Sequence, residues 1–221
     1  MLVALGDPAS LQTKGTQKTL DVLTQLLNYA NTHCNVTVRF WRSCMILHIH
    51  SDGSYLSVPK ARSRAVGHFF LSSNTSDPAK CPPNRPVHVI FKILRNVMGS
   101  AAETEVGDSY ITGQESIPLH QALEKMGNPQ LPTPMQVENT FSVGFANVTV
   151  KQKISKAIDM HFYWIQYLAK QGQFIIYWRP GTQNLGDYHT KHHPLAHHRQ
   201  MRPTYLHETE TLANNLTSKI L

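Results

Sequence analysis

Cysteine is scarce in this chain, and its scarcity limits the kinds of site that the chain can build. Cys34, Cys44 and Cys81 are the only cysteines among 221 residues, and no two of them form a C-x-x-C pair. An odd and widely spaced set favours neither a disulfide framework nor a cysteine-based zinc site. Free thiols are typical of reducing compartments, so we expect an intracellular protein, cytoplasmic or nuclear, that is not secreted.

Long apolar runs are missing as well. Residues 1–6 are apolar but far too short for a signal peptide or a spanning helix, and no later run reaches spanning length. The sequence therefore predicts a soluble protein with no membrane partner. Its length suits one sizeable domain with a flanking piece, or two small domains.

Acidic residues are few in comparison with basic ones. There are 14 Asp and Glu against 21 Lys and Arg, which gives a formal net charge of +7 and a sequence pI of about 9.4. This balance favours a polyanionic partner such as nucleic acid or an acidic membrane surface. The alternative is a basic soluble protein that binds no polyanion. Because acidic residues are few, the placement of each one is informative.

The hydrophobic pattern predicts strands and helices in a defined order. Apolar residues alternate in the strand segments and recur at helical spacing in the others. Three strands are followed by helix, strand, helix, strand and helix, which indicates an α/β protein with helices on the faces of a mixed sheet. The expected strands are 45–53, 65–71, 87–91, 135–138 and 174–178, and the expected helices are 20–30, 101–126, 158–169 and 184–191.

Four carboxylates fall at the expected ends of strands and helices. Asp52 lies at the end or middle of the first strand, Glu105 in the helix after the three strands, Glu138 at the end of the fourth strand, and Asp187 at the start of the last helix. Carboxylates that converge repel one another unless a cation compensates, and Mg²⁺ prefers such oxygen ligands. Two ions about 3.5–4 Å apart can activate water and stabilise the leaving oxygen in phosphodiester cleavage. The alternative is that each carboxylate is a solvated surface group.

Four segments resemble motifs of one protein family. HSDGSY at 50–55 is similar to the first catalytic motif of ribonuclease H domains in copia-type LTR retrotransposon polyproteins, and GSAAETE at 99–105 resembles their second motif. SKAIDMHFYWI at 155–165 resembles the helix before their final strand, and NLGDYHTK at 184–191 resembles their last motif. No single segment is specific, but four in the right order are fairly specific together.

The resemblance implies a fold, an activity and a division of the chain. The fold would be a ribonuclease H-like mixed five-stranded sheet in the order βββαβαβα, spanning 45–193. Residues 1–44 would be the helical end of a reverse transcriptase region or a connection to it, and 194–221 a basic, histidine-rich, loosely ordered tail. The implied partners are an RNA–DNA hybrid and the reverse transcriptase part of the same polyprotein.

The resemblance also implies a metal-dependent endonuclease that hydrolyses the RNA strand of the hybrid. The cofactor would be two Mg²⁺ ions, with Mn²⁺ as a substitute. Asp52 would be shared by both ions, Glu105 would lie beside it, and Asp187 would serve the second ion. At the third position the family has aspartate followed by asparagine, whereas this chain has Glu138 and Asn139.

The glutamate at this position keeps the charge but adds one methylene. Its oxygens would lie roughly 1 Å out of register, which can cost on the order of 10²-fold in rate. We therefore hold two further interpretations: a catalytically impaired nucleic-acid-binding remnant of the same domain, and an isolated fragment without a selected function.

Other side chains could serve the same chemistry. His192 or His193 could transfer a proton near Asp187, and the histidines at 189, 192, 193, 197 and 198 form either a zinc site or, as we favour, a solvated basic tail. Lys151, Lys153 and Lys156 either contact the phosphates of a nucleic acid or begin a solvated basic helix. We expect Phe162, Tyr163 and Trp164 to lie in the core and Asp159 to make a structural ion pair or cap. The expected nucleic-acid-binding residues are Asn139, Lys151, Lys153 and Lys156.

Overall fold

The computed structural model describes residues 2–74, 76–138 and 156–208 and divides the chain into two compact units. One unit contains Met1–Trp41 together with His193–Leu221, and the other contains Arg42–His192. In the described part of the chain, no helix is both long enough and apolar enough to cross a membrane.

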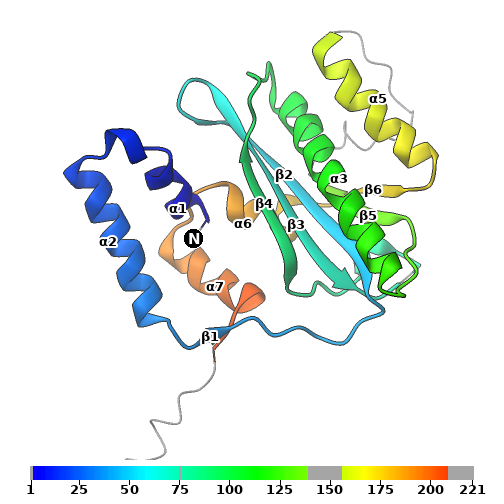
Figure 1. The fold of residues 1–221 in the computed structure, drawn as a ribbon, viewed down its shortest axis with the longest axis horizontal. Coiled ribbons are helices and arrows are strands. Elements are labelled where there is room, and N and C mark those ends of the chain that lie inside the picture. The colour runs from blue at the N-terminus through cyan, green and yellow to red at the C-terminus, as the bar shows by residue number, and fades with distance from the viewer. Residues whose placement is uncertain (1, 75, 139–155, 209–221) are drawn as a thin grey trace, which may run out of the picture. The chain divides into compact units, whose positions relative to one another are not determined.

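The larger unit is built on a mixed five-stranded sheet with the strand order β4-β3-β2-β5-β6. β2 (Ile46–Val58), β3 (Arg62–Ser72) and β4 (Pro86–Ile93) form an antiparallel meander. β5 (Thr133–Val137) pairs in parallel with β2, and β6 (Phe174–Trp178) pairs in parallel with β5. The mixed five-stranded α/β fold in the order βββαβαβα, which the sequence predicted, is confirmed (Figure 1).

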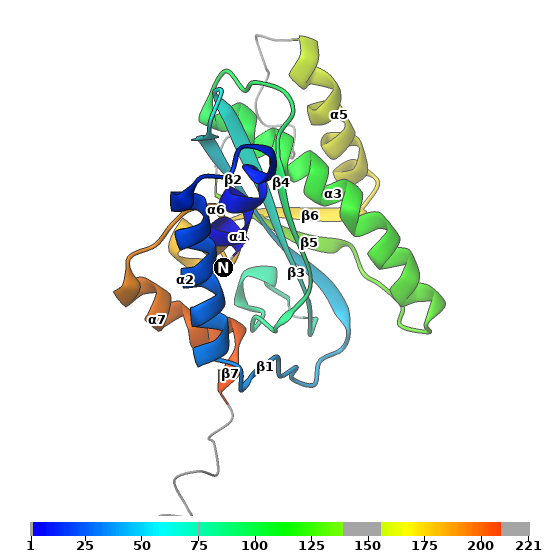
Figure 2. The ribbon, with the colours of Figure 1, turned by 60° about the vertical axis from the view of Figure 1, so that its left-hand side comes forward.

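Three helices complete this unit. α3 (Ala101–Lys125) and α5 (Lys156–Lys170) pack on each other and on one face of the sheet, while α6 (Asp187–Thr190) lies near β2 and β3 on the other face (Figures 1 and 2). Alternation along β2 produces this arrangement. Leu47 and Ile49 join the apolar core with Phe69, Met135 and residues of α3 and α5, whereas His48 and His50 face the opposite side, where their rings contact Phe70.

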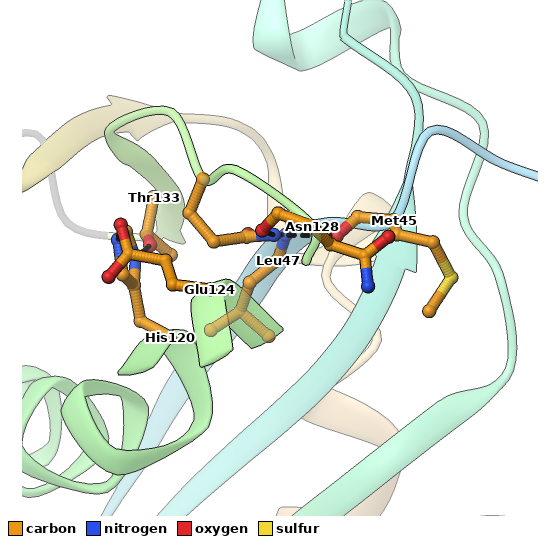
Figure 3. A network of polar contacts seen from close by, with 7 residues as sticks. Met45, Leu47, His120, Glu124, Asn128 and Thr133 are labelled. Atoms are coloured by element: carbon orange, nitrogen blue, oxygen red, sulfur yellow. Dashed lines mark hydrogen bonds and ion pairs between the residues drawn. The ribbon is translucent and has the colours of Figure 1, made fainter. Parts of the chain in front are cut away.

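A polar network closes the sheet where β2 and β5 begin (Figure 3). The Gln130 side chain accepts a hydrogen bond from the Leu47 backbone N–H and donates one to the Met45 carbonyl, each at 2.9 Å. His120 of α3 contacts the Thr133 hydroxyl at 3.1 Å and Glu124 at 3.4 Å. The loop before β5 is thereby fixed to both β2 and α3, which leaves the opposite ends of these parallel strands for the carboxylates.

The first strand and the last helix are among the elements whose bounds differ from the sequence prediction. The first strand does not end at Ser51–Gly53, because Asp52, Gly53 and Ser54 continue to pair with β3 and the strand runs to Val58. The last helix is shorter than 184–191: a 3₁₀ turn covers Gly181–Gln183, and only Asp187–Thr190 is α-helical. The first strand is longer than predicted because its backbone pairs with the long neighbouring strand β3. Hydrophobic alternation alone does not reveal this pairing.

The smaller unit contains α1 (Leu2–Ala9), the 3₁₀ turn η1 (Gln12–Lys14), α2 (Gln17–Thr32), α7 (Leu195–Tyr205) and a short antiparallel pair, β1 (Val36–Thr37) with β7 (His207–Glu208). Thr16 caps α2 through a capping box with Thr19. Within this unit the Tyr29 hydroxyl contacts His198 at 3.0 Å, and the Arg202 guanidinium lies over the Tyr29 ring at 5.7 Å.

The sequence analysis placed residues 195–208 in a basic, histidine-rich tail. These residues form α7 and β7, and they belong to the same compact unit as the N-terminal helices. The sequence pattern missed α7 because the helix has little apolar periodicity. Its order comes instead from contacts with α2 that lie far away in the sequence, such as the Tyr29–His198 hydrogen bond.

Candidate active site

Three carboxylates meet where β2 and β5 run toward α6. Asp52 lies within β2, Glu138 directly follows β5, and Asp187 is the first residue of α6. Each offers one oxygen, and these three oxygens all lie within 4.8 Å of one another. The structure therefore brings together residues that are 86 and 49 positions apart in the sequence. We call Asp52, Glu138 and Asp187 the carboxylate triad.

Glu105 approaches the triad from the other side of β2. Its carboxylate is 8% exposed and accepts a hydrogen bond from the Gly53 backbone, but it is not among the three oxygens within 4.8 Å. Strand alternation explains the separation, because Gly53 faces α3 while Asp52 faces α6. Glu105 is nevertheless close enough for the charges of Asp52 and Glu138 to act on its pKa.

Burial and mutual repulsion raise the pKa values of these acids. Burial raises the pKa of Asp52 to about 6, and the charge of Asp187 adds to the rise. Burial raises the pKa of Glu138 to about 7, with contributions from Asp52 and Asp187. Burial, together with the charges of Asp108, Asp52 and Glu138, raises the pKa of Glu105 to about 10. The site thus holds more negative charge than its surroundings can stabilise.

The residues present fit a divalent cation. Glu105 Oε2 and Glu138 Oε1 are buried and, within the part of the chain that the structure describes, accept no hydrogen bond. Buried carboxylate oxygens normally have a partner, since leaving one without a partner is costly. A hard cation satisfies such oxygens and relieves the repulsion that raises the pKa values. The donor set contains oxygen alone, which suits Mg²⁺ or Mn²⁺.

The loop before α6 is anchored to β2 by buried hydrogen bonds. The Asn184 side chain donates to the Ser51 carbonyl at 2.8 Å and accepts from the Gly186 backbone N–H at 2.8 Å. The Leu185 backbone N–H donates to His50 Nδ1 at 3.0 Å. Burial lowers the pKa of His50 to about 3, so this ring is neutral at pH 7 and its Nδ1 can accept. These bonds position Asp187 beside Asp52.

A lysine supplies positive charge beside the triad. Lys191 Nζ lies 2.5 Å from an oxygen of Asp187, one turn along the chain. The lysine side chain is 58% exposed, so its charge is screened by solvent, and it only partly opposes the rise of the Asp52 and Glu138 pKa values. One exposed ammonium group does not neutralise three carboxylates.

The Glu138 side chain fits against a glycine. A Cβ placed on Gly181 would lie 2.6 Å from Glu138 Oε2, so Gly181 leaves the space that this carboxylate occupies. The Trp178 indole N–H donates to the Glu138 backbone carbonyl at 2.7 Å, which fixes the chain as it leaves β5. The Asn184 side chain also hydrogen-bonds Glu138. Glu138, which stands where the family motif has aspartate, is therefore held in place by Gly181, Trp178 and Asn184.

The sequence analysis did not identify Asp108, which is a buried acid. Asp108 is 0% exposed on α3, one turn after Glu105, and the Ser51 hydroxyl donates a hydrogen bond to it. The spacing i, i+3 places Asp108 and Glu105 on the same face of the helix. That spacing was the available signal, but Asp108 lies outside the resembling motifs.

The remaining expected site residues are one asparagine, three lysines and two histidines. Asn139, Lys151 and Lys153 lie outside the described residues, and Lys156 begins α5. His192 is exposed, whereas the His193 ring stacks on His197 in the smaller unit at 4.4 Å. Among described residues, the carboxylate triad is the one group of three or more His, Cys, Asp or Glu side chains close enough to hold a metal.

The three aromatics expected in the core take different positions. Tyr163 is 60% exposed, so the expectation is wrong for this residue. Trp164 is half-buried and packs edge-on against Tyr110 of α3 at 5.1 Å. The side chains of Phe162 and Asp159 lie outside the described part. The exposure of Tyr163 follows from helix geometry, because adjacent residues on α5 cannot both face α3.

Comparison with known proteins finds similarity in structure alone. No protein-family model matches the chain, and no curated protein matches it in sequence. Similar solved structures include the N-terminal RNase H domain of Rv2228c from Mycobacterium tuberculosis, at 14% identity over 66% of this chain and 94% of that one, with a TM-score of 0.43. LC11-RNase H1, solved with an RNA/DNA hybrid, is 11% identical over 63% of this chain and 88% of that one, with a TM-score of 0.46. The protease–reverse transcriptase of prototype foamy virus is 13% identical over 65% of this chain and 20% of that one, with a TM-score of 0.40.

Proposed function

We propose that this chain is a metal-dependent endonuclease that hydrolyses the RNA strand of RNA–DNA hybrids. The observation that carries the proposal is the convergence of Asp52, Glu138 and Asp187, with Glu105 on the other side of β2. These are the four carboxylates that the motifs of copia-type ribonuclease H domains assign. Convergent, partly unsatisfied carboxylates are expected where cations are bound for phosphodiester cleavage.

The proposed cofactor is a pair of Mg²⁺ ions, with Mn²⁺ as a substitute. Asp52, Glu138 and Asp187 would hold it, and Glu105 would contribute from α3. When bound, the ions supply an activated water and stabilisation of the leaving oxygen. The products would carry a 3′-hydroxyl and a 5′-phosphate.

The chain's own residues orient this site and hold its charge. Asn184 and neutral His50 hold the loop that carries Asp187, and Lys191 pairs with Asp187 at the surface. We further propose that His192 or His193 transfers a proton during product release. The lysines Lys151, Lys153 and Lys156, with Asn139, would contact the hybrid, and such contacts weaken as salt rises.

The biological setting is part of the same proposal. We propose that the chain belongs to a retrotransposon polyprotein of the copia type, because its motifs resemble those of such polyproteins, and that the adjoining reverse transcriptase would be its partner. Reverse transcription leaves RNA–DNA hybrids, which are the proposed substrate. We also propose that it acts inside the cell, in the cytoplasm or nucleus.

One observation favours a second candidate, a catalytically impaired binding remnant. Glu138 stands where the motif has aspartate, and its carboxylate lies against Gly181. Mg²⁺ tolerates little deviation from octahedral geometry. Under this alternative the chain binds hybrids and metal weakly but turns over slowly.

The experiment that separates these candidates uses a hybrid labelled on either the RNA or the DNA strand. The purified chain is incubated with Mg²⁺, with Mn²⁺ or with a chelator, and Asp52→Asn is the matched blank. Cleavage of the RNA strand alone, dependent on metal and absent in the variant, supports the nuclease. Binding without cleavage in either metal supports the remnant.

A further inference from the structure

An acidic residue outside the triad lies at the centre of the contact between α3 and the sheet. Asp108 is 0% exposed, and its neighbours Thr104 and Thr112 on the same helix face are also fully buried. Burying a carboxylate is costly unless hydrogen bonds compensate, and apolar replacements of similar size often stabilise a protein. The position of Asp108 therefore calls for an explanation other than stability.

The partners of Asp108 belong to the strands that carry the site. The Ser51 hydroxyl donates to Asp108 Oδ2, and the Thr112 hydroxyl donates to Oδ1 at 3.4 Å. The backbone of Val66 in β3 also hydrogen-bonds Asp108. Ser51 directly precedes Asp52 in β2, and Val66 is the residue paired with Asp52 across the β2–β3 ladder. Asp108 thus contacts the sheet at the register of Asp52.

A second contact joins α3 to β2 on the other side of Asp52. The Gly53 backbone hydrogen-bonds the Glu105 carboxylate, and Gly53 follows Asp52 in the strand. α3 is therefore attached to β2 by Asp108 on one side of Asp52 and by Glu105 on the other. Because Glu105 and Asp108 are one helical turn apart, two attachments fix both the height and the rotation of α3 over the strand.

We propose that Asp108 is a positioning residue which, through Ser51, holds α3 where Glu105 and Asp52 can act on the same metal ions. The inference rests on the proposed function, because it concerns the geometry of that site. Asp108 touches neither substrate nor metal in this account. Without it, Glu105 keeps one attachment to β2 and can shift relative to Asp52.

One variant separates positioning from stability. In Ser51→Ala/Asp108→Val the Ser51–Asp108 pair becomes apolar, while the Val66 N–H and the Thr112 hydroxyl lose an acceptor. We expect a modest fall in melting temperature, together with a fall of about 10–100-fold in Mn²⁺ affinity, the size found for residues that orient metal ligands. For cleavage of the hybrid, kcat should fall together with the Mn²⁺ affinity, while the KM for the hybrid stays the same.

Two further variants complete the test. Asp108→Asn keeps an oxygen for the Ser51 hydroxyl and should retain most of the Mn²⁺ affinity, which makes it the conservative rescue. Ser116→Ala is the matched control, because Ser116 is equally buried on α3 but donates to the Gly113 carbonyl of its own helix. It should leave Mn²⁺ affinity unchanged.

The measurements are isothermal titration with Mn²⁺, thermal melting and steady-state cleavage of the hybrid. If the double variant binds Mn²⁺ and cleaves like the unaltered chain, the positioning role is wrong. The same conclusion follows if Asp108→Asn loses as much affinity as the double variant. If the double variant does not fold, Ser51→Ala and Asp108→Asn decide: affinity lost in the first and kept in the second supports the role, and any other pair of results contradicts it. An unaltered chain that binds no metal overturns the proposed function itself, which is a distinct result.

Discussion

Adding one methyl group at Gly181 should displace the Glu138 carboxylate without unfolding the protein. A Cβ at this position would lie 2.6 Å from Glu138 Oε2 and 2.8 Å from Oε1. To reach an ordinary contact of about 3.4 Å, Oε2 must move by roughly 0.8 Å. The backbone can accept alanine because Gly181 has no positive φ, and the atoms that must move are the end of a flexible side chain.

The cost should therefore appear in catalysis rather than in folding. A misplacement near 1 Å can cost on the order of 10²-fold in rate, so we expect Gly181→Ala to lower Mg²⁺-dependent kcat by roughly 10- to 100-fold. The melting temperature should change little. Aspartate at position 138 is one methylene shorter and would not reach Gly181, so in Glu138→Asp the same alanine should have almost no effect.

The assay is a double-mutant cycle on the cleavage of a labelled RNA–DNA hybrid. Four proteins are compared: the unaltered chain, each single variant and the pair Gly181→Ala/Glu138→Asp. A large coupling between the two positions is predicted. Equal losses from Gly181→Ala in both backgrounds would refute the steric argument, and so would no loss in the unaltered background.

Three other predictions follow from the same site. Glu138→Asp alone should raise the Mg²⁺-dependent rate, up to about 10²-fold if the extra methylene is the main defect, and an unchanged rate in steady-state cleavage would contradict that view. Because the folded-state pKa values of Asp52 and Glu138 are raised to about 6 and 7, the stability they contribute is present near pH 4 and lost as pH rises through 6–7. Mg²⁺ should offset that loss, so the rise in melting temperature with Mg²⁺ over EDTA should be small at pH 5 and larger at pH 8; a constant rise would contradict the electrostatics. Neutral His50 acts in the opposite sense, since its pKa of about 3 destabilises the fold below pH 6.5, and comparing the two solutions at each pH removes this effect. Asn184→Ala should cost about 1–3 kcal/mol of unfolding free energy in urea denaturation, because buried partners lose their hydrogen bonds, and full retention of stability and activity would exclude an anchoring role.

The order of strands and helices was predictable because it depends on local periodicity. β6 is a run of apolar and aromatic residues, and the core-facing positions of β2 alternate with polar ones. Both patterns can be read without knowledge of the partners. The extension of β2 to Val58 could not be read, because Asp52, Gly53 and Ser54 are held by pairing with β3 rather than by their own propensity.

The site was predictable in part for a similar reason. The motif resemblance identified Asp52, Glu138 and Asp187, whose convergence depends on topology that the strand order supplies. It could not show that Glu105 approaches from the opposite side of β2, since that depends on which face each residue of the strand presents. Asp108 was missed because its partner, Ser51, is 57 residues away in the sequence.

The helix α7 could not be predicted from the sequence for a related reason. Its histidines and arginines give no apolar face, and the contacts that hold it come from α2, at the other end of the chain. Polar side-chain contacts between distant segments leave no period in the sequence.

The most direct test of the central claim is the cleavage of an RNA–DNA hybrid by the unaltered chain and by Asp52→Asn, with Mg²⁺ and with Mn²⁺. Asp52 is the buried member of the carboxylate triad, and asparagine keeps its shape while removing its charge. We expect metal-dependent cleavage of the RNA strand that falls by at least about 10²-fold in the variant. Folded protein that cleaves equally well with asparagine at this position would contradict it.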